Sequence, residues 1–453
     1  MYFVYSLLLT LGLLVLLPRF LFDAIRHGKY VAGFRERLGS LPAIESKGRP
    51  VVWLHCVSVG ESQAAQPLVR AIRKRFPEYI LVISTITLTG QKLARELFKE
   101  EATKVFYFPF DWRGTVRRAL RTINPAAVLI METELWPGFL RECQARQTPV
   151  AIVNGRLSEQ SFRRYNLIKG FLSRVLKGLS VAVMQTEADA DRIRRLGLHS
   201  SKVFVSGNLK FDAGTMTAPK SLTREFRQRF NLSSDTPLIL AASTHAPEER
   251  IILEAFQHMR VDSGLGCRLL LAPRHPERFA EVRSLLQRSG LSWTSRSSPP
   301  NPTDAKCDVI LLDTIGELRS IYSLASIVFV GGSLANSGGH NIIEPAATGA
   351  AIVTGAHTLN FDVIVKAFAK DRAIVQLPIL SGEEAKIELA TVFRELLGDD
   401  QRRQELGQRA KQLVGENLGA TERTLELLNS ILATRPVAGQ QHSSASAGGP
   451  DPP

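Results

Sequence analysis

The sequence predicts an α/β protein made of two doubly wound domains that face a central cleft. Its 453 residues exceed what one hydrophobic core usually serves, and 44% hydrophobic with 22% charged residues is an ordinary globular composition. Short apolar segments alternate with amphipathic helical segments along almost the whole chain. Because the apolar segments are nearly continuous, we expect parallel sheets covered by helices on both faces. Ligands of such folds bind at the carboxyl ends of the strands.

The expected strands fall into two groups of six, one in each half of the chain. The first group is 51–57, 79–85, 104–108, 126–131, 149–153 and 181–184. The second group is 237–241, 267–272, 308–312, 327–330, 351–354 and 373–376. A stretch rich in Thr, Ala, Gly and Pro joins the two halves. We therefore predict a first domain at 23–211, a linker at 212–221 and a second domain at 222–434.

The two ends of the chain differ from its body. Residues 2–18 carry no charge, and basic residues such as Arg19, Arg26 and Lys29 follow them. This pattern predicts an N-terminal membrane anchor at 1–22, with the body on the cytoplasmic face of the inner membrane. Residues 435–453 contain few apolar side chains, so we expect a disordered tail there.

The net charge indicates the kind of partner, and the cysteine spacing indicates the state of the thiols. The formal net charge of +14 and a pI near 9.8 require a polyanionic partner, which leaves nucleic acid, anionic lipid or a phosphorylated substrate. The four cysteines lie far apart, mostly inside apolar segments, and are expected to be reduced core thiols. The apolar N-terminus favours a membrane surface over nucleic acid.

The end of the first predicted strand carries a candidate general base. Glu61 follows a turn at Gly60 and stands at the start of a helix. A carboxylate there can deprotonate a hydroxyl if burial raises its pKa toward neutrality. The alternative, that Glu61 only complements the helix dipole, is equally compatible with the spacing.

The glycine-rich stretch 338–346 lies between an apolar strand and a helix and has the character of a nucleotide site. We expect the helix to start near Asn341, where unpaired backbone N–H groups suit a phosphate. Glu344, one turn further, can accept hydrogen bonds from ribose hydroxyls. No complete dinucleotide or P-loop pattern is present, so the glycines alone also fit a simple helix start.

Three further features of the sequence bear on metal and lipid binding. Asp189 and Asp191 resemble a metal-binding pair, but they lie in a charged helical segment and a solvated face explains them better. His55, on an apolar strand, is expected to be a hydrogen-bonded core residue, and we assign no metal. The segment 161–177 predicts an amphipathic helix, which we expect to meet acyl chains and phosphates, although Gly170 weakens the helix.

Six ordered motifs resemble the Kdo transferases of lipid A biosynthesis, glycosyltransferases of the GT-B type with two Rossmann-like domains. They are VSVGE at 57–61, METELWP at 131–137, NGRLS at 154–158 with SFRRY at 161–165, GNLKFD at 207–212, PRHPERF at 273–279, and GGHN at 338–341 with EPA at 344–346. The resemblance spans roughly residues 20 to 425. Gly155 replaces a common Ala, and Ile342-Ile343 replaces a common Pro-Leu; neither change removes a chemical group.

The resemblance implies inverting, metal-independent transfer of Kdo (3-deoxy-D-manno-octulosonic acid) from CMP-Kdo to a lipid A precursor, without a cofactor. It implies Glu61 as the general base, with Glu132 and Lys210 supporting the transition state. The donor contacts that it implies are Pro273, Arg274, His275, Ile315, Gly316, Glu317, Asn341, Ile342, Ile343 and Glu344.

Two alternatives stay open at this point. Another nucleotide-sugar transferase or epimerase of GT-B fold would share the two domains but not the full set of motifs. A non-catalytic scaffold that binds acidic lipid would need neither Glu61 nor the nucleotide loop.

Overall fold

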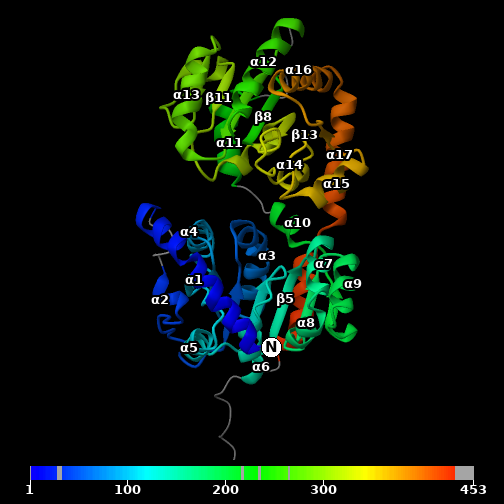
Figure 1. The fold of residues 1–453 in the computed structure, drawn as a ribbon. Helices are drawn as coiled ribbons and strands as arrows, with labels where there is room; N and C mark the ends of the chain where they lie inside the picture. The colour runs from blue at the N-terminus through cyan, green and yellow to red at the C-terminus, as the bar shows by residue number, and fades with distance from the viewer. Residues whose placement is uncertain (1, 28–32, 216–218, 233–235, 264–265, 434–453) are drawn as a thin grey trace, which may run out of the picture. The chain divides into compact units, whose positions relative to one another are not determined.

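The computed structural model describes residues 2–27, 33–215, 219–232, 236–263 and 266–433. It contains two compact α/β units, Met1–Ala213 together with Leu418–Pro453, and Gly214–Asn417 (Figure 1). Part of the predicted linker, 216–218, and the predicted tail, 435–453, lie outside the described residues.

The first unit is built on a seven-stranded parallel sheet with the order β3-β2-β1-β4-β5-β6-β7. Its strands are β1 (Val51–His55), β2 (Ile80–Thr85), β3 (Lys104–Tyr107), β4 (Ala127–Met131), β5 (Val150–Gly155), β6 (Val181–Met184) and β7 (Val203–Val205). Its helices are α1 (Tyr2–His27), α2 (Phe34–Arg37), α3 (Val59–Arg75), α4 (Leu88–Leu97), α5 (Arg113–Ile123), α6 (Pro137–Ala145), α7 (Glu159–Asn166), α8 (Lys169–Leu176), α9 (Glu187–Arg195), α10 (Leu209–Gly214) and α18 (Ala420–Leu432).

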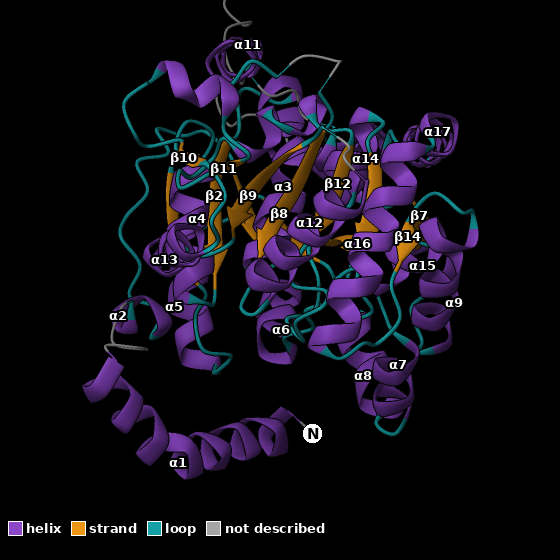
Figure 2. Ribbon diagram, turned by 90° about the horizontal axis from the view of Figure 1, so that it is seen from above, coloured by secondary structure: helices purple, strands orange, loops and turns teal. Residues whose placement is uncertain are grey.

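The second unit repeats the plan with the strand order β10-β11-β9-β8-β12-β13-β14, again parallel throughout. Its strands are β8 (Leu238–Thr244), β9 (Arg268–Pro273), β10 (Trp293–Ser295), β11 (Val309–Leu311), β12 (Ile327–Val330), β13 (Ala351–Thr354) and β14 (Val375–Gln376). Its α-helices are α11 (Lys220–Arg229), α12 (Glu248–Ser263), α13 (Phe279–Arg288), α14 (Ile343–Thr348), α15 (Asp362–Lys370), α16 (Gly382–Gly398) and α17 (Asp400–Glu416). Helices surround the strands, as the fully buried central strands require (Figure 2).

The predicted fold class of two parallel α/β domains is confirmed, and all twelve predicted strand segments contain a strand. Two strands were not predicted, β7 and β10. Each has three residues, lies at the edge of its sheet and is partly exposed, so neither produces a continuous apolar segment.

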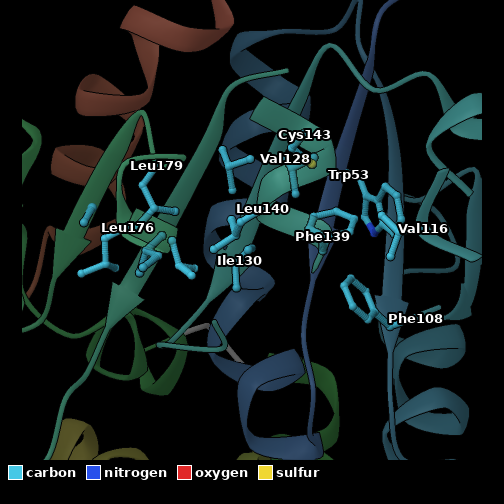
Figure 3. Packing of buried hydrophobic residues seen from close by; sticks show 14 of the residues in the cluster. Trp53, Phe108, Val116, Val128, Ile130, Phe139, Leu140, Cys143, Leu176 and Leu179 are labelled. Carbon is cyan, nitrogen blue, oxygen red and sulfur yellow. The ribbon is translucent and has the colours of Figure 1, made fainter. Parts of the chain in front are cut away.

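The core of the first unit packs aromatic rings beneath the central strands (Figure 3). Trp53 of β1 lies edge-on to Phe139 at 5.1 Å between ring centroids, and Phe108 lies 5.0 Å from the same ring. Trp53 also donates to the Ser84 hydroxyl at 2.7 Å, which satisfies its buried N–H. The four cysteines are free and buried, as predicted. This packing leaves β1 fully buried up to its last residue, His55.

The C-terminal helix α18 returns to the first unit, which differs from the predicted second domain of 222–434. Leu425, Leu428 and Leu432 lie in the core on the α3 side of the first sheet. Asp212 accepts hydrogen bonds from the backbone of Gly419 at 2.8 Å and of Thr421 at 2.6 Å, which fixes the entry of the helix. An amphipathic helix needs an apolar surface to cover, and here that surface belongs to the earlier sheet.

Helix α1 contains the segment that was predicted as a membrane anchor. Across the described ranges, the chain contains no helix that is both long and apolar enough to cross a membrane. Tyr5 of α1 donates to the Asp111 carboxylate at 2.8 Å, and Trp112 donates to the Thr10 hydroxyl at 3.2 Å.

The single amphipathic helix predicted at 161–177 is two helices, α7 and α8. The break falls at Leu167 and Ile168, whose side chains are 86% and 50% exposed. The prediction of one continuous helix is therefore wrong, and the break places two apolar side chains on the surface.

Candidate active site

The predicted base and its neighbour Glu132 lie where the order of the first sheet reverses. Strands β1 and β4 are parallel neighbours, but the chain leaves them toward opposite sides of the sheet. Loops that follow such a pair of strands diverge and form a binding site at their carboxyl ends. Glu61 follows β1 and Glu132 follows β4, so the two carboxylates belong to this site.

Glu61 closes a reciprocal cap at the start of α3. Ser58 is the N-cap residue, and its hydroxyl accepts the Glu61 N–H at 3.4 Å. The Glu61 carboxylate accepts the backbone N–H of Val57 at 2.7 Å and the Ser58 hydroxyl at 2.9 Å. The dipole-complementing role weighed from the sequence is therefore real, because the carboxylate satisfies donors at the helix start.

The same carboxylate also has the acidity of a general base. Burial of Glu61, followed by the nearby Glu132 carboxylate, raises its pKa to about 7, although hydrogen bonds from Val57 and Ser58 act in the other direction. The side chain is only 7% exposed. A base with this pKa can accept a proton at neutral pH and release it again.

Lys210 and a second acidic residue complete this group. The Lys210 ammonium lies 3.8 Å from a Glu132 carboxylate oxygen, and Glu132 has a left-handed backbone with φ of 53°. Glu134 was not assigned a role from the sequence, yet burial and the Glu132 charge raise its pKa. The Glu-Thr-Glu spacing after a strand was the available signal. The structure thus brings Glu61, Glu132 and Lys210 into one group, as the motifs suggested.

The second unit has a matching reversal between β8 and β12, and histidines gather beside it. His245 follows β8, and its Nε2 lies 2.8 Å from Nε2 of His340. The ring of His275 meets that of His245 edge to face at 5.0 Å. Burial and the charge of Arg274 lower the pKa of His340 to about 3, which keeps that ring neutral.

Arg274 and His275, predicted as donor contacts, are exposed after β9. Pro273, by contrast, is the buried last residue of that strand. The Arg274 N–H donates to the Thr244 carbonyl at 3.0 Å, which ties this turn to the one that carries His245. The contact between His245 and His340 was not predicted, because an isolated histidine in a sequence gives no sign of its partner.

The glycine-rich stretch 338–346, which we call the nucleotide loop after its predicted role, enters α14 at Ile343, two residues later than the predicted start near Asn341. The Asn341 side chain accepts the Ile343 N–H at 3.0 Å. Ile342 and Ile343 are fully buried, backbone included, so the structure exposes neither of these predicted contacts to a ligand. Glu344 is held by Arg319 at 2.7 Å and faces the Asn341 amide at 3.4 Å.

The segment 315–317, predicted to contact the cytosine of the donor, is an exposed loop. Ile315 is 79% exposed and Gly316 has φ of 86°, a conformation that favours glycine. Glu317 pairs with Arg296 at 2.9 Å and with the Thr314 hydroxyl, so its carboxylate holds the loop in shape.

An open pocket of about 490 Å³ in the second unit adjoins Glu344. Its lining includes Lys220, Arg224, Arg227 and Arg319. This concentration of cations beside Glu344 suits an anionic ligand.

Asp189 and Asp191, which resemble a metal-binding pair in the sequence, have different surroundings in the structure. Asp189 is buried and accepts the Leu157 N–H at 2.8 Å, which corrects the expectation of a solvated face, whereas Asp191 is exposed and pairs with Arg194 at 2.7 Å. Within the described residues, no group of His, Cys, Asp and Glu side chains could hold a metal ion. His55 is a core residue, as predicted, with its Nδ1 2.9 Å from the Ser84 hydroxyl.

Comparisons with known proteins identify relatives of this chain. A family model described as 3-deoxy-D-manno-octulosonic-acid transferase (kdotransferase) matches residues 32–213. The chain is 33% identical over 410 residues to the 3-deoxy-D-manno-octulosonic acid transferase of Haemophilus influenzae, covering 90% of this chain and 93% of that protein.

Two solved structures show the fold. A glycosyltransferase from Rickettsia africae matches with a TM-score of 0.54 at 13% identity, covering 85% of this chain and all of that chain (100%). The UDP-GlcNAc 2-epimerase of Neisseria meningitidis matches with a TM-score of 0.55 at 14% identity, covering 84% of this chain and 100% of that chain.

The fold, with its two parallel α/β domains, resembles the GT-B plan, and the similarity to a Kdo transferase over 90% of the chain places the protein among the glycosyltransferases. Within that class, the chain belongs to the 3-deoxy-D-manno-octulosonic acid transferase (Kdo transferase) family.

Proposed function

We propose that this protein transfers Kdo from CMP-Kdo to the glucosamine disaccharide of a lipid A precursor, lipid IVA, with inversion at the anomeric carbon. Family membership supports the reaction class. The observation that carries the mechanism is Glu61, a buried carboxylate with a pKa of about 7 at the reversal point of the first sheet.

In this mechanism Glu61 accepts the proton of the acceptor hydroxyl while the hydroxyl oxygen bonds to C2 of Kdo. The bond between C2 and the phosphate oxygen breaks, and CMP leaves with the bonding electrons. Lys210 beside Glu132 balances the negative charge of the first-unit group. Arg274 and the backbone near Asn341 meet the charge on the departing phosphate, and Glu344 meets the ribose. In this proposal, Arg274 and the backbone N–H groups stabilise the negative charge of the leaving phosphate, and no metal ion is needed.

The acceptor is a lipid, so we also propose that the protein works at the cytoplasmic face of the inner membrane. Several apolar side chains of α1 are exposed, among them Leu8 at 62% and Val15 at 78%. Leu167, at the break between α7 and α8, is a further exposed apolar group. These side chains suit contact with the membrane interface and with acyl chains.

The test is to incubate the purified protein with CMP-Kdo and tetra-acylated lipid A precursor and to weigh the products. We expect the lipid mass to rise by one or more Kdo units, with and without excess EDTA. A product bearing another sugar, or an epimerised nucleotide sugar, would favour the other GT-B enzyme classes. Lipid binding without any product would favour a scaffold.

A further inference from the structure

Glu248, in the first turn of α12, accepts hydrogen bonds from five backbone N–H groups. One carboxylate oxygen accepts from His245 at 2.9 Å and from Gly332 at 2.7 Å. The other accepts from Ser333, Leu334 and Ala335 at 2.9, 2.9 and 3.2 Å. The side chain is completely buried. Glu248 therefore joins the turn after β8 to the glycine-containing loop 331–335, which follows β12.

Successive backbone N–H groups that converge on one point form an anion-binding concavity, which in many glycine-rich loops holds a phosphate. In the loop 331–335 this position is already filled by the Glu248 carboxylate. The fit is close, because a Cβ on Gly331 would lie 2.7 Å from the Ser243 carbonyl oxygen and 2.8 Å from Glu248. The loop thus has a built-in anion, and its shape is set before any ligand arrives.

The two segments that Glu248 joins carry the residues of the second-unit site. His245 lies in the first segment, and its ring contacts His340 at 2.8 Å. The second segment supports the nucleotide loop, because the Gly339 N–H donates to the Gly332 carbonyl at 2.8 Å. Asn341 and Glu344 follow directly. Glu248 therefore helps to set the position of the nucleotide loop relative to His245, together with the His245–His340 contact.

We propose that Glu248 is a positioning residue of the donor site, an internal anion that replaces a phosphate in the glycine loop and holds the nucleotide loop against His245. The identity of the donor rests on the proposed function, whereas the locking of loop 331–335 does not. Glu248 touches no substrate in this scheme; it acts through the backbone of the residues that do.

The decisive variant is Glu248→Ala, because the atoms removed have the size and charge of acetate. We expect faster amide hydrogen exchange in a peptide covering 331–335, measured by mass spectrometry. We also expect the donor KM to rise on the order of tenfold while the acceptor KM changes by less than about twofold, since buried N–H donors lose their charged acceptor in the second unit only. Added acetate should restore both the slow exchange and the donor KM, whereas neutral acetamide should not.

Glu249→Ala is the matched control, because Glu249 is equally buried in the same turn but binds the Thr244 hydroxyl at 3.0 Å and Arg278 at 2.6 Å. We expect it to lose stability and to keep the slow exchange of 331–335 and the wild-type donor KM. If Glu248→Ala does not fold, Glu248→Gln keeps the shape and tests the charge by the same two readouts.

Unchanged exchange in the Glu248 variants, equal changes in both KM values, or equal rescue by acetamide would overturn the proposal. The exchange and acetate measurements report on the loop even if the wild type transfers no Kdo. A failure of the proposed function is therefore distinguishable from a failure of this inference.

Discussion

Glu61 combines two properties that usually exclude each other. A carboxylate that caps a helix start is normally kept ionised by the donors around it. Here burial and the Glu132 charge outweigh the hydrogen bonds from Val57 and Ser58, and the pKa rises to about 7. The cap fixes the position of the carboxylate, and burial adjusts its acidity. One side chain is thereby both oriented and able to exchange a proton at neutral pH.

Glu61→Gln tests the catalytic role directly. The amide fills the same space but cannot accept the hydroxyl proton, so we expect kcat to fall on the order of a hundredfold or more. Initial rates with CMP-Kdo and acceptor measure this, and CMP affinity by calorimetry should be unchanged. Glu142→Gln is the control, because Glu142 is buried and paired with Arg113 and Arg117 outside the site. Near-wild-type turnover of Glu61→Gln at neutral pH would contradict the assignment.

The raised pKa of Glu61 also predicts how stability depends on pH. In the unfolded chain the group titrates near 4.5, and in the folded protein at about 7. The unfolded state therefore loses this proton first, and the contribution of Glu61 to stability declines as pH rises from about 4.5 to 7. Glu61→Gln removes the decline, so it should gain on the order of 3 kcal/mol relative to wild type between pH 4.5 and 8. Calorimetric unfolding at both pH values measures the difference, and an equal effect of the substitution at both would show that the pKa is not raised.

Glu344→Ala tests the predicted ribose contact. Loss of the carboxylate leaves buried hydroxyl groups of the ligand without a partner, which should weaken CMP binding by roughly 1–3 kcal/mol and raise the donor KM more than the acceptor KM. Because Glu344 pairs with Arg319, the variant Arg319→Ala should be measured beside it to separate loss of the ion pair from loss of the acceptor. Unchanged CMP affinity in a folded Glu344→Ala protein would mean that Glu344 only pairs with Arg319.

At the level of elements, the recurring unit is a strand, a short turn and a capped helix. In β1–α3 the N-cap residue is Ser58, and in β2–α4 it is Thr87, which accepts the Gly90 N–H at 3.0 Å. In both caps the side chain accepts a backbone N–H of the first helical turn, but only in the first does the cap residue also bind a carboxylate that is a candidate base. In β8–α12 the corresponding carboxylate, Glu248, reaches across to a neighbouring strand's loop instead. The same local motif thus carries the candidate base in one unit and the proposed positioning residue in the other.

Ser58→Ala separates the cap from the acidity of the base. We expect a stability loss of about 1 kcal/mol, typical for removal of an N-cap side chain. The Ser58 hydroxyl also favours the ionised form of Glu61, so its removal should raise the pKa of Glu61 further. The pH at which kcat/KM reaches half its maximum should then move upward. Thr87→Ala should lose similar stability and leave the pH profile in place; an identical shift in both variants would contradict the argument.

At the level of the whole molecule, the sequence predicted what is local and missed what depends on distant partners. Continuous apolar segments were sufficient for twelve of the strands, and motifs at strand ends located Glu61 and Arg274. The short strands β7 and β10 gave no such signal. The amphipathic face of α18 did not say which sheet it covers, and Glu248 binds a loop more than 80 residues away. Neither the packing of α18 on the first sheet nor the contact of Glu248 with its loop can be predicted from the spacing of nearby residues.

The return of α18 predicts that the first unit depends on the far end of the chain. Leu425, Leu428 and Leu432 are buried in its core, and the Tyr79 hydroxyl donates to the Leu432 carbonyl. Each buried leucine contributes roughly 2–5 kcal/mol, against a total stability of about 5–15 kcal/mol for a typical domain. Deleting 418–453 should therefore unfold the first unit.

Near-ultraviolet circular dichroism and calorimetry measure this deletion. We expect loss of the aromatic signal from the packed Trp53 region and loss of part of the unfolding transition. Deleting only 435–453 is the control and should leave both signals unchanged, because it keeps every contact of α18 described above. A chain lacking 418–453 that unfolds at the wild-type temperature with an intact aromatic signal would show that α18 covers the first sheet without stabilising it, since cooperative folding of the unit would then not require the three leucines.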